Sequence, residues 1–138
     1  MADQALAEGD LGRLAARGRA EQIAGDLKLL AGTTRAVRTY SALGSLGEIP
    51  ALARKHDLKV MLGSWLDADR ERNEREIHSL ITLAQAGRVD IAVVGNEVLL
   101  RGELPETELL AYIQRVKEAV PEDVRVGCVD AYYVFLER

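Results

Sequence analysis

The chain has little cysteine, little aromatic content and no excess of positive charge. Its single cysteine among 138 residues, Cys128, cannot form a disulfide within the chain and is typical of a small core residue. The net charge is −4, with both signs interspersed, so nothing favours binding to nucleic acid or to an anionic membrane. No apolar run approaches the ~20 residues that a membrane-spanning helix needs.

Signals for export and for cofactor binding are also lacking. Met1 to Glu8 does not show the charged-then-apolar order of a signal peptide, so the chain as written is expected to be cytoplasmic. A longer parent protein that is exported or tethered to a membrane stays compatible with this sequence. His56 and His78 lack the spacing of metal ligands, and there is no glycine-rich phosphate loop. We therefore expect no metal and no cofactor.

Hydrophobic patterning predicts strands that alternate with helices. Strands are expected at residues 35–41, 59–65, 89–94 and 124–131, and helices at residues 23–30, near 48–50, at 69–86 and at 105–120. This order predicts an α/β fold with about four parallel strands and flanking helices. Residues 1–19 show no strand pattern and are expected to be a flexible or helical segment. The domain is then expected to span residues 20–138.

The predicted strand at residues 89–94 and the residues after it are the most informative part of the chain. Its β-branched residues barely alternate with polar ones, which indicates a strand buried on both faces, as in a parallel sheet. Asn96 and Glu97 follow directly. A carboxylate at the C-terminal end of such a strand lies where barrel enzymes keep their catalytic groups.

The string V-V-G-N-E-V-L-L-R-G-E-L at residues 93–104 resembles glycoside hydrolase family 17 in its bacterial form. This family comprises the 1,3-β-glucanases and related β-glucan transglycosylases. Residues 35–41, 58–66 and 126–133 resemble its second, third and fifth strands, in that order. The resemblance implies a partial (β/α)8 TIM-type barrel with strands two to five. A whole barrel typically takes ~250 residues, so the match covers only about half of one.

The resemblance also implies chemistry at the end of the third predicted strand. Glu97 would be the general acid/base in the retaining cleavage or transfer of β-1,3-glucan, and Asn96 would hydrogen-bond the 2-hydroxyl of the sugar. The alternatives are a solvated or capping glutamate and a loop asparagine. The family's nucleophile is a second glutamate near the end of strand seven. Asp130, the nearest carboxylate in the chain, does not match that position, so the isolated chain is expected to lack a nucleophile and to be inactive.

Further residues are candidates for the sugar site. Arg38 and Tyr40 alternate with their neighbours, so they point to one face of the predicted strand, where the family has an arginine and a tyrosine. A barrel-filling arginine and a core tyrosine are the alternatives. Trp65 ends the next strand and either stacks on a pyranose ring or belongs to the core. Tyr132 and Tyr133 are expected at the end of the last strand, where at most one of them faces the cleft.

Two functions from different classes are compatible with these residues. One is a glycosidase or transglycosylase domain, whose partner is a β-glucan oligosaccharide or polysaccharide. The other is a non-catalytic half-barrel that binds glucan or assembles with itself or with a missing barrel half. Half a barrel leaves two open strand edges and an uncovered inner face, and such edges favour pairing with another chain. Arg101, which follows the Asn-Glu pair, either holds the loop or is solvated.

Overall fold

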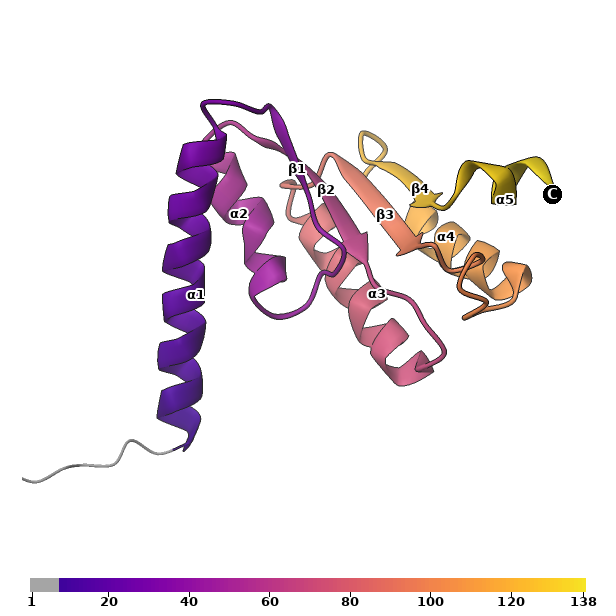
Figure 1. The fold of residues 1–138 in the computed structure, drawn as a ribbon, viewed down its shortest axis with the longest axis horizontal. Coiled ribbons are helices and arrows are strands. Elements are labelled where there is room, and N and C mark those ends of the chain that lie inside the picture. Colours follow the sequence, from indigo (N-terminus) through magenta and orange to yellow (C-terminus); the bar gives the residue numbers. More distant parts are fainter. Residues whose placement is uncertain (1–7) are drawn as a thin grey trace, which may run out of the picture.

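The computed structural model describes the backbone of residues 8–138 and the side chains from residue 19 onward. Expectations for residues 1–7 lie outside the described residues. The elements are, in chain order, α1 (Glu8–Leu30), β1 (Ala36–Arg38), the 3-10 helix η1 (Gly44–Glu48), α2 (Ile49–Arg54), β2 (Lys59–Ser64), α3 (Arg70–Gln85), β3 (Ile91–Asn96), α4 (Glu106–Ala119), β4 (Arg125–Val129) and α5 (Tyr132–Leu136) (Figure 1).

The four strands form one parallel sheet in the order β1-β2-β3-β4, as predicted. Helices α2, α3 and α4 connect successive strands and pack on one side of the sheet (Figure 1). Right-handed crossovers between parallel strands place successive helices on the same side, which gives the curved half of a (β/α)8 barrel. The fold is therefore a partial TIM-type barrel, and β1 and β4 are the two edges of its sheet.

The two sides of the sheet differ in cover, and we call them the outer and inner faces. The outer face carries Val60, Leu62, Ala92 and Val94, which are fully buried under the helices. Side chains alternate along a strand, so Met61 on β2 and Ile91 on β3 point to the inner face. Met61 and Ile91 are only half-buried there, and among the described residues Figure 1 shows no helix across this face.

Helix α3 shows why these boundaries arise. Asp69 precedes it in extended conformation, and its side chain accepts a hydrogen bond from the Arg72 backbone N–H, which satisfies one free donor of the first turn. The helix ends at Gln85, shortly before Gly87, which adopts a φ of +81°. The expected helix at residues 69–86 is thus confirmed to within one residue at each end.

Helix α1 is a long helix that Figure 1 shows at one end of the molecule, where it lies beside α2. It runs without a break across the predicted boundary between residues 19 and 20. Leu27 is buried against the rest of the fold, whereas Leu29 and Leu30 are exposed. The division into a segment at residues 1–19 and a domain at residues 20–138 stays a prediction.

Candidate active site at the carboxyl edge of the sheet

The predicted site residues follow the C-terminal ends of four neighbouring strands. Tyr40 comes two residues after β1, Trp65 directly after β2, and Glu97 directly after β3. Tyr132 and Tyr133 follow β4 after two intervening residues. All four strands are parallel and adjacent, so these residues lie at one edge of the sheet, as expected. Their roles in binding and catalysis stay predictions.

A β-bulge at the end of β3 sets the direction of the Asn-Glu pair. Val93 pairs with Gly127 and Asn96 with Val129, so one extra residue of β3 lies between these pairs. Gly95 lies in this bulge with a φ of +83°, and a Cβ there would come within 2.6 Å of a methyl group of Val98. Only glycine suits both the backbone conformation and the space.

Glu97 is exposed and adopts a φ of +53°, a left-handed conformation that a non-glycine residue rarely takes. Such a conformation costs about 1–3 kcal/mol, so the surrounding hydrogen bonds must hold it in place. The Glu97 N–H donates to the Val129 carbonyl at 2.8 Å, and the Glu97 carbonyl accepts from the Arg101 N–H at 2.9 Å. Backbone strain of this kind occurs at functional sites and also in turns, as at Asp57, which has a φ of +56°.

The side chain of Asn96, at the end of β3, is held by Arg38 from the edge strand β1, which β2 separates from β3. The Arg38 Nη2 donates to the Asn96 Oδ1 at 2.7 Å, and the guanidinium carbon lies 4.6 Å from the centre of the Tyr40 ring. This bond engages the carboxamide oxygen as an acceptor and leaves the Asn96 Nδ2 to donate to a ligand. The Arg38 Nε is buried without a hydrogen-bond partner among the described residues.

A glycine in β2 permits the approach between β1 and β2 at this edge. A Cβ at Gly63 would collide with the Thr39 carbonyl oxygen and would lie 3.0 Å from the Tyr40 Cα. The Gly63 N–H donates to the Thr39 hydroxyl at 3.1 Å. Tyr40 is thereby placed next to β2 with 52% of its surface exposed, so its ring is accessible rather than part of the core.

Trp65 is half-buried, and one of its ring faces is already occupied. The Arg101 guanidinium carbon lies 4.4 Å from the ring centre, at the distance of a cation–π contact. The indole N–H donates to the Asp67 carboxylate at 3.3 Å. A pyranose ring could therefore stack only on the opposite face of Trp65.

The expectation that Tyr132 and Tyr133 alternate as strand residues was wrong, although both follow the C-terminal end of β4. The strand β4 ends at Val129, and both tyrosines belong to the first turn of α5, where strand alternation does not apply. Their rings pack edge to face with centres 5.7 Å apart. Between the strand and this helix, the Asp130 side chain accepts from the backbone N–H groups of Leu99 and Ala131, the local kind of bond that competes with strand pairing.

Sequence reasoning missed two buried polar residues on α3 that hold the loops of the site. The Glu76 carboxylate accepts hydrogen bonds from the Ser41 hydroxyl and from the Ala42 N–H, the latter at 2.9 Å. The Asn73 side chain bonds the Asp67 backbone through both its oxygen and its nitrogen. Both residues are fully buried. Their position on the apolar stripe of α3 indicates them in the sequence, because a polar side chain that is buried there needs a hydrogen-bond partner.

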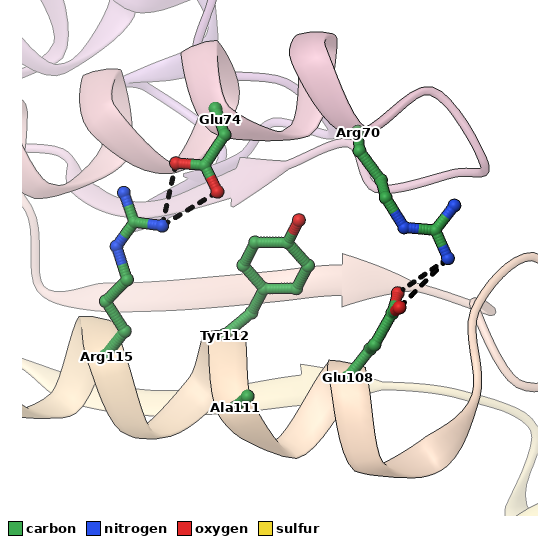
Figure 2. A pocket seen from close by; sticks show the side chains of 6 residues that line it. All are labelled: Arg70, Glu74, Glu108, Ala111, Tyr112 and Arg115. Atoms are coloured by element: carbon green, nitrogen blue, oxygen red, sulfur yellow. Dashed lines mark hydrogen bonds and ion pairs between the residues drawn. The ribbon is translucent and has the colours of Figure 1, made fainter.

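A shallow hollow of about 220 Å³ lies away from this edge, between α3 and α4 on the outside of the molecule (Figure 2). Arg70 pairs with Glu108 and Arg115 with Glu74 on either side of Tyr112. Hydrogen bonding to Glu108 raises the pKa of Arg70 above its usual range. The four charged side chains of the hollow thus form two exposed ion pairs.

The remaining chemistry of the described residues is limited. No group of three potential metal ligands occurs among them, and none of their helices is long and apolar enough to cross a membrane. Burial, and secondarily the charge of Asp130, raises the pKa of the Cys128 thiol. A raised pKa disfavours the reactive thiolate, which agrees with a structural role for this cysteine.

Curated proteins similar to this chain include two that are named as glucan 1,3-beta-glucosidases. The chain is 35% identical over 106 residues to a glucan 1,3-beta-glucosidase of Arthroderma benhamiae, which covers 73% of this chain and 33% of that protein. It is 26% identical over 127 residues to the glucan 1,3-beta-glucosidase BGL2 of Candida albicans, which covers 82% of this chain and 41% of that protein. The chain thus spans less than half the length of either relative.

Solved structures agree with this relationship. A glycoside hydrolase family 17 beta-1,3-glucanosyltransferase from Rhizomucor miehei superimposes with a TM-score of 0.75 at 29% identity, covering 84% of this chain and 46% of that one. An active-site mutant of the Rhizomucor enzyme in complex with laminaritriose gives 0.73 at 28% identity. The expected bacterial form is not tested by these comparisons.

A family model described as the BtgE/BtgC glycoside hydrolase domain matches residues 12–138, nearly the whole chain. The half-barrel fold and the relatives of family 17 agree with this match. The chain belongs to the BtgE/BtgC glycoside hydrolase domain family and is a glycoside hydrolase family 17-like domain.

Proposed function

We propose that this chain forms the acid/base half of a retaining enzyme that cleaves or transfers β-1,3-glucan. The observation that carries the proposal is the arrangement at the end of β3. Glu97 is exposed there in a strained conformation, beside an Asn96 whose side chain is oriented by Arg38. The relatives named as glucan 1,3-beta-glucosidases support the substrate class.

In the proposed reaction Glu97 protonates the oxygen of the leaving sugar while a second carboxylate attacks the anomeric carbon. Glu97 then takes a proton from water in hydrolysis, or from an acceptor sugar in transfer. Asn96 donates its Nδ2 hydrogen to the 2-oxygen of the sugar, an interaction that strengthens as the transition state forms. Tyr40 and the free face of Trp65 offer aromatic surface for neighbouring sugar rings.

The nucleophile of the proposed enzyme comes from outside the strands described here. Asp130 lies at the carboxyl ends of the strands, where Glu97 also lies. Its two carboxylate oxygens already accept hydrogen bonds from Leu99 and Ala131. The open edges of β1 and β4 and the half-buried inner face are the surfaces on which further strands would complete the barrel. We propose that these strands belong to a complementary barrel half; a second copy of this chain is the alternative partner.

The ligand-binding part of this proposal can be tested on the chain by itself. Trp65 is the single tryptophan, so its fluorescence reports on this edge of the sheet alone. Titration with laminaritriose should change the emission, whereas cellotriose, which has the same sugars in β-1,4 linkage, should change it much less. Equal responses to both, or no response to either, would contradict a β-1,3-glucan site at this edge.

The catalytic part requires an activity assay. The isolated chain is expected to show negligible hydrolysis of laminarin, because no nucleophile is available to form the covalent intermediate. Activity should appear on mixing with a polypeptide that carries the remaining barrel strands, and Glu97→Gln should abolish it. Hydrolysis by the chain alone that disappears in Asp130→Asn would make Asp130 the nucleophile instead. Specific binding without activity in any mixture would favour the non-catalytic glucan-binding module.

A further inference from the structure

Arg101 holds both peptide groups that flank the Cα of Glu97. On the N-terminal side, the Arg101 Nη2 donates to the Asn96 carbonyl at 2.9 Å, while the N–H of the same peptide group donates to Val129. On the C-terminal side, the Arg101 backbone N–H donates to the Glu97 carbonyl at 2.9 Å. The orientation of these two peptide groups defines the φ and ψ angles of Glu97, and hence the direction of its Cβ.

The Arg101 side chain is itself fixed by the neighbouring loop at residues 65–69. Its Nη2 also donates to the Leu66 carbonyl at 3.0 Å, and its planar guanidinium lies over the Trp65 ring. Its Nη1 is 3.3 Å from the Glu103 carboxylate, whose other oxygen accepts from the Ala68 N–H at 3.1 Å. Arg101 therefore connects the loop that carries Glu97 to the loop that carries Trp65.

Two observations distinguish Arg101 from a solvated surface arginine. Its side chain is only 24% exposed, and its Nε is buried without a hydrogen-bond partner among the described residues. A guanidinium is kept in such a place because it donates to two carbonyls and stacks on an aromatic ring at the same time. A lysine ammonium provides the charge but neither the planar stacking nor the fixed pair of donors.

We propose that Arg101 is a positioning residue that sets the left-handed backbone of Glu97 and, through it, the direction of the Glu97 carboxyl group. The role of that carboxyl group as acid/base rests on the proposed function above. The effect of Arg101 on the Glu97 backbone does not depend on the proposed function, and it can be measured without substrate.

Residue-resolved amide hydrogen exchange on the 138-residue chain tests the proposal. The Glu97 N–H is the reporter, and the N–H of Asp90, which donates to the Val60 carbonyl just before the opposite end of β3, is the internal reference. In Arg101→Ala the charged hydrogen bond from Nη2 to the Asn96 carbonyl is lost, and this carbonyl belongs to the same peptide group as the Glu97 N–H. The Glu97 amide should therefore exchange about tenfold faster or more relative to the amide of Asp90. Arg101→Lys should give an intermediate ratio.

The matched control is Arg115→Ala, which removes the same charge from an exposed ion pair with Glu74. It should leave the ratio between Glu97 and Asp90 unchanged. A general loss of stability would accelerate both amides together, so a changed ratio is specific to the local contact. If Arg101→Ala does not fold, Arg101→Lys makes the same comparison. An unchanged ratio in a folded Arg101 variant would overturn the proposal.

The fluorescence of Trp65 provides a second readout and separates the two proposals. Removing the guanidinium from the indole ring should shift the emission of Arg101→Ala, while Arg115→Ala should leave it as in the wild type. If the wild-type chain does not respond to laminaritriose, the proposed function fails, but the exchange ratio still decides the role of Arg101. If laminaritriose binds and the ratio is unchanged, only the positioning role fails.

Discussion

Leu62 and Met61 are neighbours on β2 and point to opposite faces of the same sheet. Leu62 is fully buried beneath the helices, whereas Met61 on the inner face is only half-buried. In a complete (β/α)8 barrel the inner face would be filled by layers of side chains from opposing strands. The difference shows that the helices bury the outer layer, whereas Met61 on the inner face keeps part of its surface exposed.

The largest effect is expected from a cavity in the outer layer. Leu62→Ala should lower the free energy of unfolding by about 2–5 kcal/mol, because the helices packed over the outer face collapse only partly into the space. The matched variant Met61→Ala should cost about 1 kcal/mol, since its side chain is only partly removed from water. Urea denaturation monitored by circular dichroism measures both. Equal losses would show that the inner face is covered in solution.

Glycines should show the same contrast between crowded and open positions. A Cβ at Gly95 would contact Val98, Leu109 and Leu66 in the outer layer, whereas a Cβ at Gly102 would meet nothing within 4 Å. Both have positive φ angles, so both alanine variants are strained. Gly95→Ala should cost roughly 2–4 kcal/mol and Gly102→Ala about 1–2 kcal/mol in the same denaturation experiment. A smaller loss at Gly95 than at Gly102 would contradict the bulge geometry.

Patterning in the sequence predicted the layers well because each strand and helix has a strong local signal. The parallel order, the extent of α3 and the position of Glu97 after β3 follow from the apolar periodicity and from the alternation of strands with helices. These features depend on residues that are close in sequence. The family resemblance added the chemistry, which periodicity alone does not contain.

Contacts between distant residues explain what could not be predicted. The bond between Arg38 and Asn96 joins residues 58 positions apart, and the bond from Leu99 to Asp130 joins residues 31 positions apart. The second bond lies where β4 has ended, and Tyr132 and Tyr133 follow it in a helix despite the preference of tyrosine for strands. Local propensity does not register a hydrogen-bond partner supplied from elsewhere in the fold.

Two glutamates on α3, one buried and one exposed, allow a finer test of the contrast between covered and open surfaces. Glu76→Gln weakens the buried hydrogen bonds to Ser41 and Ala42 and should cost about 1–3 kcal/mol. Glu74 lies on the solvent side of the same helix, so Glu74→Gln loses only an exposed ion pair, worth up to about 1 kcal/mol. Thermal unfolding at neutral pH compares the two variants. A larger loss in Glu74→Gln would mean that the buried carboxylate does not hold the loop after β1.

The smallest effect is expected where the chain leaves the sheet. Tyr132 is 77% exposed, and its ring packs edge to face with the Tyr133 ring. Tyr132→Ser should therefore change the free energy of unfolding by about 0.5 kcal/mol or less in denaturation of the dilute chain. Repeating the measurement at higher protein concentration makes it sensitive to association, because a partner that binds only the folded state raises the apparent stability. If wild-type stability rises with concentration and that of Tyr132→Ser does not, a second copy covers this end of the sheet in solution. If neither changes, the inner face of the isolated chain stays open, as expected for a barrel half that is completed by strands of a different sequence.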